Sequence, residues 1–180
     1  QIEYSKGIQS SGNGLLGLID EILDLSKSEA GQMTLEYLEV PIQEMVEEQQ
    51  ALFGPLAKEK KLDFKIEIAQ NVPGVIETDK MRVGQILKNL LSNALKFTEK
   101  GSVSLEIKTH PTNFNTLCFG VRDTGIGIAP EKQRLIFEAF QQADGSTKRK
   151  YGGTGLGLSI SRELAKLLGG EIVLSSKVNQ

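Results

Sequence analysis

One segment of this chain, residues 79–97, constrains the fold more than any other, because its apolar residues recur at helical spacing. An apolar stripe along one side of a helix must be covered by another layer of secondary structure. Asp79 is the first residue of the segment and is of a residue type that caps helix N-termini. The sequence therefore predicts a helix from Asp79 to about Phe97 that lies on a core. The stripe consists of Val83, Ile86, Leu87, Leu90, Leu91, Ala94 and Phe97.

The rest of the chain alternates between strand-like and helix-like segments. Short runs with a period of two predict strands, and longer runs that begin at Pro or end at Gly predict helices. Gly54-Pro55 is expected to break or bend the first of these helices. This order predicts an α/β fold built as a two-layer sandwich, with strands on one side and helices on the other. The predicted strands are 33–40, 62–68, 101–108, 116–122 and 171–175, and the further helices are 41–60, 130–140 and 156–168.

Residues 1–31 form a distinct N-terminal segment. Ile8, Leu15 and Ile22 are spaced seven apart, and Leu18, Ile19 and Leu25 fill alternate positions. This is the spacing of a coiled-coil or helix-bundle seam, and Gly31 is a suitable helix end. The helix could instead pack on its own domain. We favour a partner helix, because little else in the chain offers a matching heptad.

Composition excludes several classes of protein. The 180 residues carry a formal charge of −2 and a single cysteine, Cys118. A nearly balanced charge gives no electrostatic footprint for nucleic acid or an anionic membrane, so no nucleic-acid partner is expected. One cysteine excludes an internal disulfide framework and a CxxC zinc pair. Without a long apolar run or a secretory signal, the expected location is cytoplasmic, with a membrane anchor in a longer protein left open.

A row of amides lies beside the apolar stripe of the 79–97 helix. Gln85, Asn89 and Asn93 follow at successive i, i+4 steps, and Lys96 comes next. Such a row could be an ordinary solvated side of the helix. It also suits Mg-ATP, because Mg²⁺ keeps most of its waters and takes only one or two protein oxygens. A lysine near the same end can meet a phosphate as a point charge.

Two glycine-containing motifs follow. Residues 123–128, DTGIGI, come directly after an apolar strand, so Asp123 lies where a ligand can approach the backbone closely. An aspartic protease would need a second DTG or a dimer, and the chain has one copy. Residues 152–159, GGTGLGLS, open a helix whose N-terminal N–H groups favour an anion, although the spacing fits neither a P-loop nor a dinucleotide fingerprint. Lys148, Arg149 and Lys150 upstream are either a solvated charge run or a mobile cationic flap over phosphates.

Together these elements resemble the catalytic domain of sensor histidine kinases, within the wider gyrase and heat-shock-chaperone ATPase superfamily. Residues 85–98 (QILKNLLSNALKFT) look like the asparagine box, 123–128 the first glycine box, 137–140 (FEAF) the phenylalanine box, and 153–158 (GTGLGL) the second glycine box. Residues 1–31 resemble the second helix of the dimerisation and phosphoacceptor domain, and 32–180 the catalytic domain. The resemblance implies a mixed sheet under three helices and places the family's last strand after residue 180.

The resemblance also implies residue roles in binding ATP and Mg²⁺. Asn93 would hold Mg²⁺, Asn89 would support metal or phosphate, and Lys96 would meet the phosphates. Asp123 would accept a hydrogen bond from the adenine amino group, and Gly125 and Gly127 would let the base approach. Gly153, Gly155 and Gly157 would hinge the flap and line the phosphates. The remaining expected nucleotide contacts are Phe97, Ile128, Phe140, Lys148, Arg149, Thr154 and Leu156.

The resemblance predicts phosphoryl transfer to a protein histidine, followed by relay to a response-regulator receiver aspartate, in a homodimeric longer protein. Gln85 stands where ATP-hydrolysing relatives carry a glutamate base, and an amide cannot abstract a proton, so transfer is favoured over hydrolysis. The sole histidine, His110, lies in an expected turn and lacks the helix of a phosphoacceptor. The chain alone is therefore expected to bind ATP without autophosphorylating. A gyrase- or chaperone-like ATPase, a non-catalytic nucleotide-binding module and an anti-sigma-type serine kinase remain alternatives.

Overall fold

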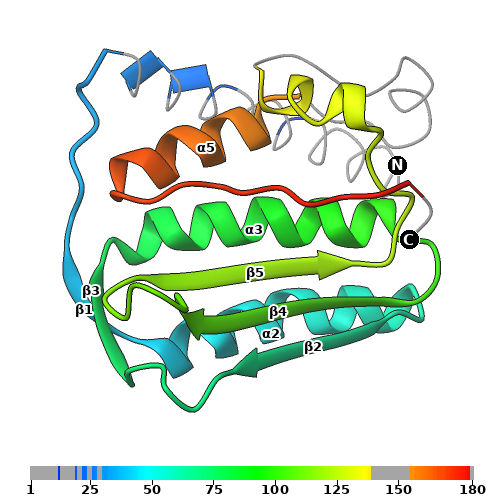
Figure 1. Cartoon of the computed structure of the whole chain (residues 1–180), viewed down its shortest axis with the longest axis horizontal. Helices are drawn as coiled ribbons and strands as arrows, with labels where there is room; N and C mark the ends of the chain where they lie inside the picture. Colours follow the sequence, from blue (N-terminus) through cyan, green and yellow to red (C-terminus); the bar gives the residue numbers. More distant parts are fainter. Residues whose placement is uncertain are drawn as a thin grey trace.

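The computed structural model describes residues 12, 19, 22–23, 26–27, 30–138 and 155–178. Figure 1 shows strands in front of two long helices, with a third helix beside them. In chain order the elements are β1 (Leu38–Pro41), α2 (Ile42–Glu59), β2 (Asp63–Ile68), β3 (Val75–Thr78), α3 (Lys80–Phe97), β4 (Ser102–Thr109), β5 (Leu117–Asp123), the 3₁₀ turns η1 (Pro130–Lys132) and η2 (Leu135–Phe137), and α5 (Gly157–Leu167).

The main sheet is mixed and has the order β2-β4-β5. β2 and β4 run parallel, whereas β4 and β5 are antiparallel. The central strand β4 turns Val103, Leu105 and Ile107 inward, and all three are fully buried. This alternation is what a strand with one covered face requires. The predicted two-layer sandwich with a mixed sheet is therefore confirmed.

Helices α2 and α3 cover the inner face of this sheet (Figure 1). Their buried residues join those of β4 in one apolar cluster, which includes Phe53 of α2 and Leu87 and Leu91 of α3. Helix α2 continues through Gly54 and Pro55, so the expected break does not occur, and the alternative of a bend stays a prediction. Phe53 and Ala57 are buried on either side of the proline, and their packing holds the helix together where propensity alone would end it.

The predicted N-cap of α3 is confirmed. Asp79 Oδ1 accepts the N–H of Arg82 at 3.0 Å, and Asp79 Oδ2 accepts the N–H of Glu36 at 3.0 Å. One buried carboxylate thus starts α3 and also ties the segment before β1 to the domain. The helix that carries the amide row is fixed at its first residue.

Two expected elements differ in the structure, and one strand was not predicted. The predicted strand 33–40 is shorter and displaced, as β1 covers only Leu38–Pro41. Its antiparallel partner β3, Val75–Thr78, was not predicted, because four residues are too few to show a period. The segment expected as a helix from 130 forms two 3₁₀ turns within its described part.

The predicted strand 171–175 is not formed. Residues 170–177 are extended, but among the described residues no backbone hydrogen bond joins them to a neighbouring strand. A segment with alternating apolar residues forms a strand only when a neighbouring strand provides backbone hydrogen-bond partners. In the described sheet, β5 pairs with β4 alone. One edge of β5 therefore has no hydrogen-bonded strand among the described residues.

The described residues of the N-terminal segment up to Lys27 are helical, and Ile19, Ile22 and Leu23 among them are about half exposed. The domain boundary at residue 31 and the dimer seam stay predictions. No helix among the described residues has the length and apolar character needed to cross a membrane.

Candidate nucleotide-binding site

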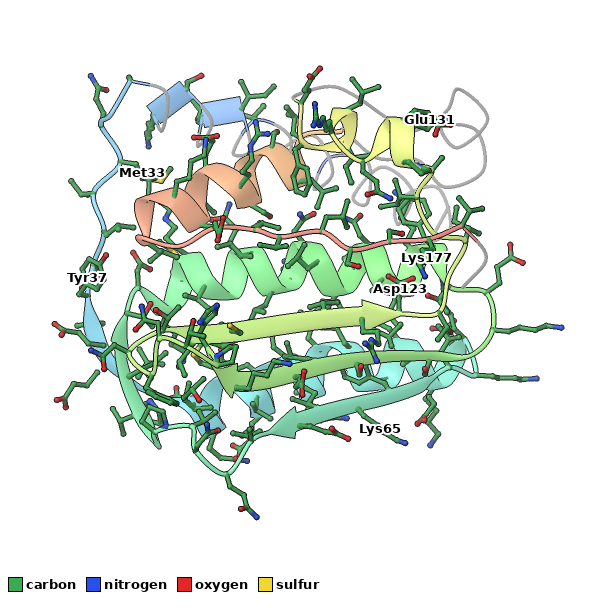
Figure 2. The ribbon with its side chains drawn as sticks, in the orientation of Figure 1. Met33, Tyr37, Lys65, Asp123, Glu131 and Lys177 are labelled. Atoms are coloured by element: carbon green, nitrogen blue, oxygen red, sulfur yellow. The ribbon has the colours of Figure 1, made fainter. Side chains whose placement is uncertain are left out.

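Most of the described residues predicted to bind ATP line one cavity beside α3. The cavity has a volume of about 3020 Å³, because it continues along β5 beside the extended C-terminal segment. Figure 2 shows Asp123 at the end of β5, close to Lys177 in this view. The predicted site residues that line the cavity are Asn89, Asn93, Lys96, Phe97, Asp123, Gly127, Ile128, Gly155 and Gly157.

Three predicted residues within the described part do not line this cavity. Leu156 is fully buried in a small cluster with Ile160 and Leu164. Gln85 lies one turn before Asn89, and its Oε1 accepts a hydrogen bond from Arg82 Nη1 at 2.9 Å. Gly125 lies within the turn that follows β5, against the end of α3. Phe140, Lys148, Arg149, Lys150, Gly153 and Thr154 lie outside the described residues.

The amides of α3 are linked to each other and to α5. Asn89 Nδ2 donates to Ser161 Oγ at 2.9 Å, and Asn93 Nδ2 donates to Asn89 Oδ1 at 3.4 Å. Both asparagines are half-buried. Ser161 was not singled out in the sequence, because a serine inside a helix pattern carries no motif of its own.

Asp123 is held by the turn that it begins. Its Oδ1 accepts the N–H of Gly125 at 2.8 Å, a local carboxylate–backbone turn. A Cβ on Gly125 would come within 2.5 Å of the Phe97 carbonyl oxygen, so only glycine fits against the end of α3. This packing places the end of β5 beside Lys96 and Phe97. Asp123 is exposed, and its second oxygen accepts no hydrogen bond from a described residue.

Gly127 was expected to be glycine so that a base could approach. The structure shows another reason, the close approach of the C-terminal segment. Its φ is +68°, and a Cβ there would come within 2.1 Å of the Lys177 carbonyl oxygen. Beside it, Ile128 N–H donates to Ser176 Oγ at 2.9 Å, and Gln133 Nε2 donates to both the Ile128 and Ser176 carbonyls. Hydrogen bonds thus join the end of the first glycine motif, at Ile128, to the C-terminal segment at Ser176. Contact between these glycines and a base stays a prediction.

Lys96 stands at the last turn of α3. Burial lowers the pKa of its ammonium below the ordinary 10.5. Its Nζ lies 5.1 Å from the centre of the Phe97 ring. A partly desolvated cation of this kind interacts more strongly with an anion than one in bulk water does.

The donor set suits Mg²⁺ better than a transition metal. The described residues contain no cluster of three or more His, Cys, Asp or Glu side chains. Asn93 lines the cavity, and its Oδ1 accepts no hydrogen bond from a described residue. One neutral oxygen beside space for water and phosphate matches what Mg²⁺ takes from proteins that bind nucleotides.

Comparison with known proteins gives the family. Residues 78–180 match the family described as histidine kinase-, DNA gyrase B-, and HSP90-like ATPase, which is more than half of the chain. The chain belongs to this family. Several other members are similar over nearly the whole of its length.

Two curated relatives are named as histidine kinases. The chain is 41% identical over 179 residues to hybrid signal transduction histidine kinase B of Dictyostelium discoideum, a match that covers 98% of this chain and 9% of the relative. It is 37% identical over 182 residues to the signal transduction histidine-protein kinase BarA of Escherichia coli, covering all of this chain and 20% of BarA. The chain therefore spans a fifth or less of these relatives.

Two solved structures share the fold of this ATPase-family chain. Full-length ShkA, crystallised with AMPPNP, superposes with a TM-score of 0.86 at 33% identity over all of this chain and 36% of ShkA. Histidine kinase ThkA, solved in complex with the response regulator protein TrrA, gives a TM-score of 0.64 at 25% identity, over 88% of this chain and 42% of ThkA.

Proposed function

We propose that this chain is the ATP-binding catalytic domain of a sensor histidine kinase. It transfers the γ-phosphoryl group of Mg-ATP to a histidine on a dimerisation domain, for relay to an aspartate of a response regulator. The observation that carries the proposal is one cavity lined by Asn93 and Lys96 from α3 and by Asp123 from the end of β5. The names of the relatives and the AMPPNP bound to ShkA support it.

The two ends of the nucleotide meet different chemistry in this cavity. Asp123 uses one carboxylate oxygen for the turn to Gly125 and keeps the other for the adenine amino group. Lys96 and the N-terminus of α5 at Gly157 take the phosphates, because a cation and unpaired helix N–H groups both favour negative charge. The adenine base is thereby recognised by a hydrogen-bond acceptor, Asp123, and the phosphates are bound by the positive charge of Lys96 and of the α5 N-terminus.

Mg²⁺ would be held by Asn93, with Asn89 one turn earlier in support. When bound, the ion neutralises phosphate charge as the phosphoryl group leaves. The protein's own part is positioning, since phosphoryl transfer to an imidazole needs alignment and charge stabilisation more than a strong base. Asn93 contributes an oxygen without adding negative charge beside the triphosphate.

The acceptor histidine belongs to another domain. His110 follows β4, where its Nδ1 accepts the Thr112 N–H at 3.3 Å within a tight turn. His110 lies outside every described helix, whereas the family resemblance implies a phosphoacceptor histidine on a helix of a dimerisation domain. The chain alone therefore binds ATP and leaves its own histidine unmodified, and in the longer protein it acts within a homodimer.

Binding tests the first half of the proposal. Calorimetric titration with AMPPNP, with Mg²⁺ or with EDTA, is expected to give tighter binding in Mg²⁺ for the wild type. Asn93→Ala is expected to remove that difference, a loss of about tenfold or more in the metal-dependent part of the affinity. Asn71→Ala is the matched control, because Asn71 is an exposed loop amide bonded to Thr109. The absence of nucleotide binding, or an equal loss in both variants, would contradict the proposal.

Turnover distinguishes transfer from hydrolysis. Gln85 supplies no base, and its oxygen is occupied by Arg82. We therefore expect no sustained ATP hydrolysis by this chain, but formation of acid-labile phosphohistidine when a dimerisation domain is supplied as a separate protein. Sustained release of phosphate without that domain would instead favour a gyrase- or chaperone-like ATPase.

A further inference from the structure

Three polar side chains form a chain of hydrogen bonds from α5 to the cavity. Ser161 lies on α5 and is only 2% exposed. Its Oγ accepts from Asn89 Nδ2 at 2.9 Å, and Asn89 Oδ1 in turn accepts from Asn93 Nδ2 at 3.4 Å. Both bonds run in one direction, so each amide donates towards α5.

The direction of this chain has a physical cause at the start of α5. Helix α5 begins at Gly157, and the atom nearest to a Cβ built there is Asn89 Oδ1, at 2.2 Å. Unpaired N–H groups give a helix N-terminus a partial positive charge, which attracts an amide oxygen rather than an amide NH₂. The oxygen of Asn89 therefore faces the start of α5, and its nitrogen faces Ser161.

The direction decides which atom Asn93 presents. With Nδ2 engaged by Asn89, the group of Asn93 that remains for the cavity is Oδ1, which accepts no hydrogen bond from a described residue. If both amides were flipped, Asn89 Nδ2 would donate to Asn93 Oδ1 and occupy one lone pair of that oxygen, and the NH₂ of Asn93 would face the cavity. An amide NH₂ has no lone pair for a cation, so the direction seen here leaves both lone pairs of Asn93 Oδ1 available to Mg²⁺.

We propose that Ser161 is a positioning residue for magnesium. Through Asn89 it orients the carboxamide of Asn93 so that Oδ1 serves as the metal ligand. This inference rests on the proposed role of Asn93. It extends the site to a buried side chain on α5 that does not line the cavity, and it makes metal binding depend on how α5 is docked on α3.

The test compares two buried serines of the same helix. Ser159 is 3% exposed, but its hydroxyl donates to the Leu156 carbonyl at 2.7 Å and makes no described bond to the amides. AMPPNP affinity is measured in Mg²⁺ and in EDTA for Ser161→Ala, Ser159→Ala, Asn93→Ala and the wild type. Ser161→Ala is expected to lower the Mg²⁺/EDTA affinity ratio about tenfold while the EDTA affinity stays constant, as for other groups that orient a metal ligand.

The outcomes separate the two proposals. A ratio that falls in Asn93→Ala but is unchanged in Ser161→Ala overturns the positioning role. An equal fall in Ser159→Ala also overturns it, because the effect would then be general loosening of α5. A wild-type protein that binds AMPPNP without any benefit from Mg²⁺ contradicts the proposed function itself.

A measurement on the wild type needs no substitution. The side-chain NH₂ protons of Asn89, observed by NMR in the nucleotide-free protein, are expected to exchange with solvent more slowly than those of the exposed Asn113. Equal, fast exchange for both asparagines would mean that Ser161 does not hold Asn89, and the positioning role would fail even if Ser161→Ala did not fold.

Discussion

The two sides of α3 are packed very differently. Towards α2 and the sheet, Val83, Leu87 and Leu91 belong to a large buried cluster that also takes in β4. Towards α5, the buried cluster formed by described residues consists of Leu156, Ile160 and Leu164, with Ile86 among the apolar residues packed on it, and the contact continues through hydrogen-bonded amides. One side therefore supports the fold, and the other supports the site.

The difference in packing explains how one helix can support both the fold and the binding site. A large apolar cluster tolerates no voids, so it fixes the position of the α3 backbone. A small cluster with polar contacts costs little to open, which suits an element that must accommodate a nucleotide. We call the face of α3 towards α2 and the sheet the rigid side, and the face towards α5 the loose side. The amides lie between the two: the rigid side fixes their backbone, and contacts on the loose side orient their side chains.

The largest effect is expected from a cavity on the rigid side. Leu91 is fully buried, and Leu91→Ala is expected to lower the free energy of unfolding by about 3 kcal/mol. The midpoint of urea denaturation measures this loss. Met81→Ala on the same helix, where the side chain is 66% exposed, is the control and should stay within about 0.5 kcal/mol of the wild type. Equal effects of the two substitutions would contradict the packing described for α3.

A substitution on the loose side is expected to lower the free energy of unfolding less than Leu91→Ala does, but to weaken nucleotide binding more. Leu164 is 1% exposed, and Leu164→Ala is expected to lower the free energy of unfolding by about 2 kcal/mol, because its described buried cluster is smaller than that of Leu91. It should also weaken Mg-AMPPNP binding, whereas Leu91→Ala should not do so under conditions where the protein stays folded. Calorimetry on both variants well below their melting temperatures measures this. If the two variants affected binding alike, the two sides of α3 would not be functionally distinct.

The sequence predicted the rigid side better than the loose one. The stripe of α3 and the cap at Asp79 follow from helical spacing and cap chemistry, which are local signals. The continuity of α2 through Pro55 and the bond between Asn89 and Ser161 depend on tertiary packing, which leaves no periodic trace in the chain. The contact that requires glycine at position 127 also could not be predicted from the sequence, because Lys177 lies far from it along the chain.

The smallest expected effect concerns pH. Burial lowers the pKa of Lys96 below 10.5, so the charged form of this lysine reduces the stability of the fold below its folded pKa. That cost is relieved as pH rises through the folded pKa towards 10.5. Phosphate favours the charged form, so nucleotide affinity should fall over the same rise in pH. Titrations at several pH values up to about 10 should show this decline in the wild type but not in Lys96→Arg, whose guanidinium stays protonated. The same decline in both proteins would assign the effect to another group.

The most direct test of the whole account is the effect of Asp123→Asn on AMPPNP affinity. An asparagine can keep the hydrogen bond from Gly125 N–H through its carbonyl oxygen, so the turn after β5 is preserved. It places an NH₂ group where the adenine amino group needs an acceptor. We predict that the variant melts at the wild-type temperature and binds Mg-AMPPNP at least about tenfold more weakly, since a buried polar group left unpaired carries such a penalty. Unchanged affinity in the folded variant would mean that the nucleotide does not lie where Asp123 and α3 meet, and would contradict the proposed binding site.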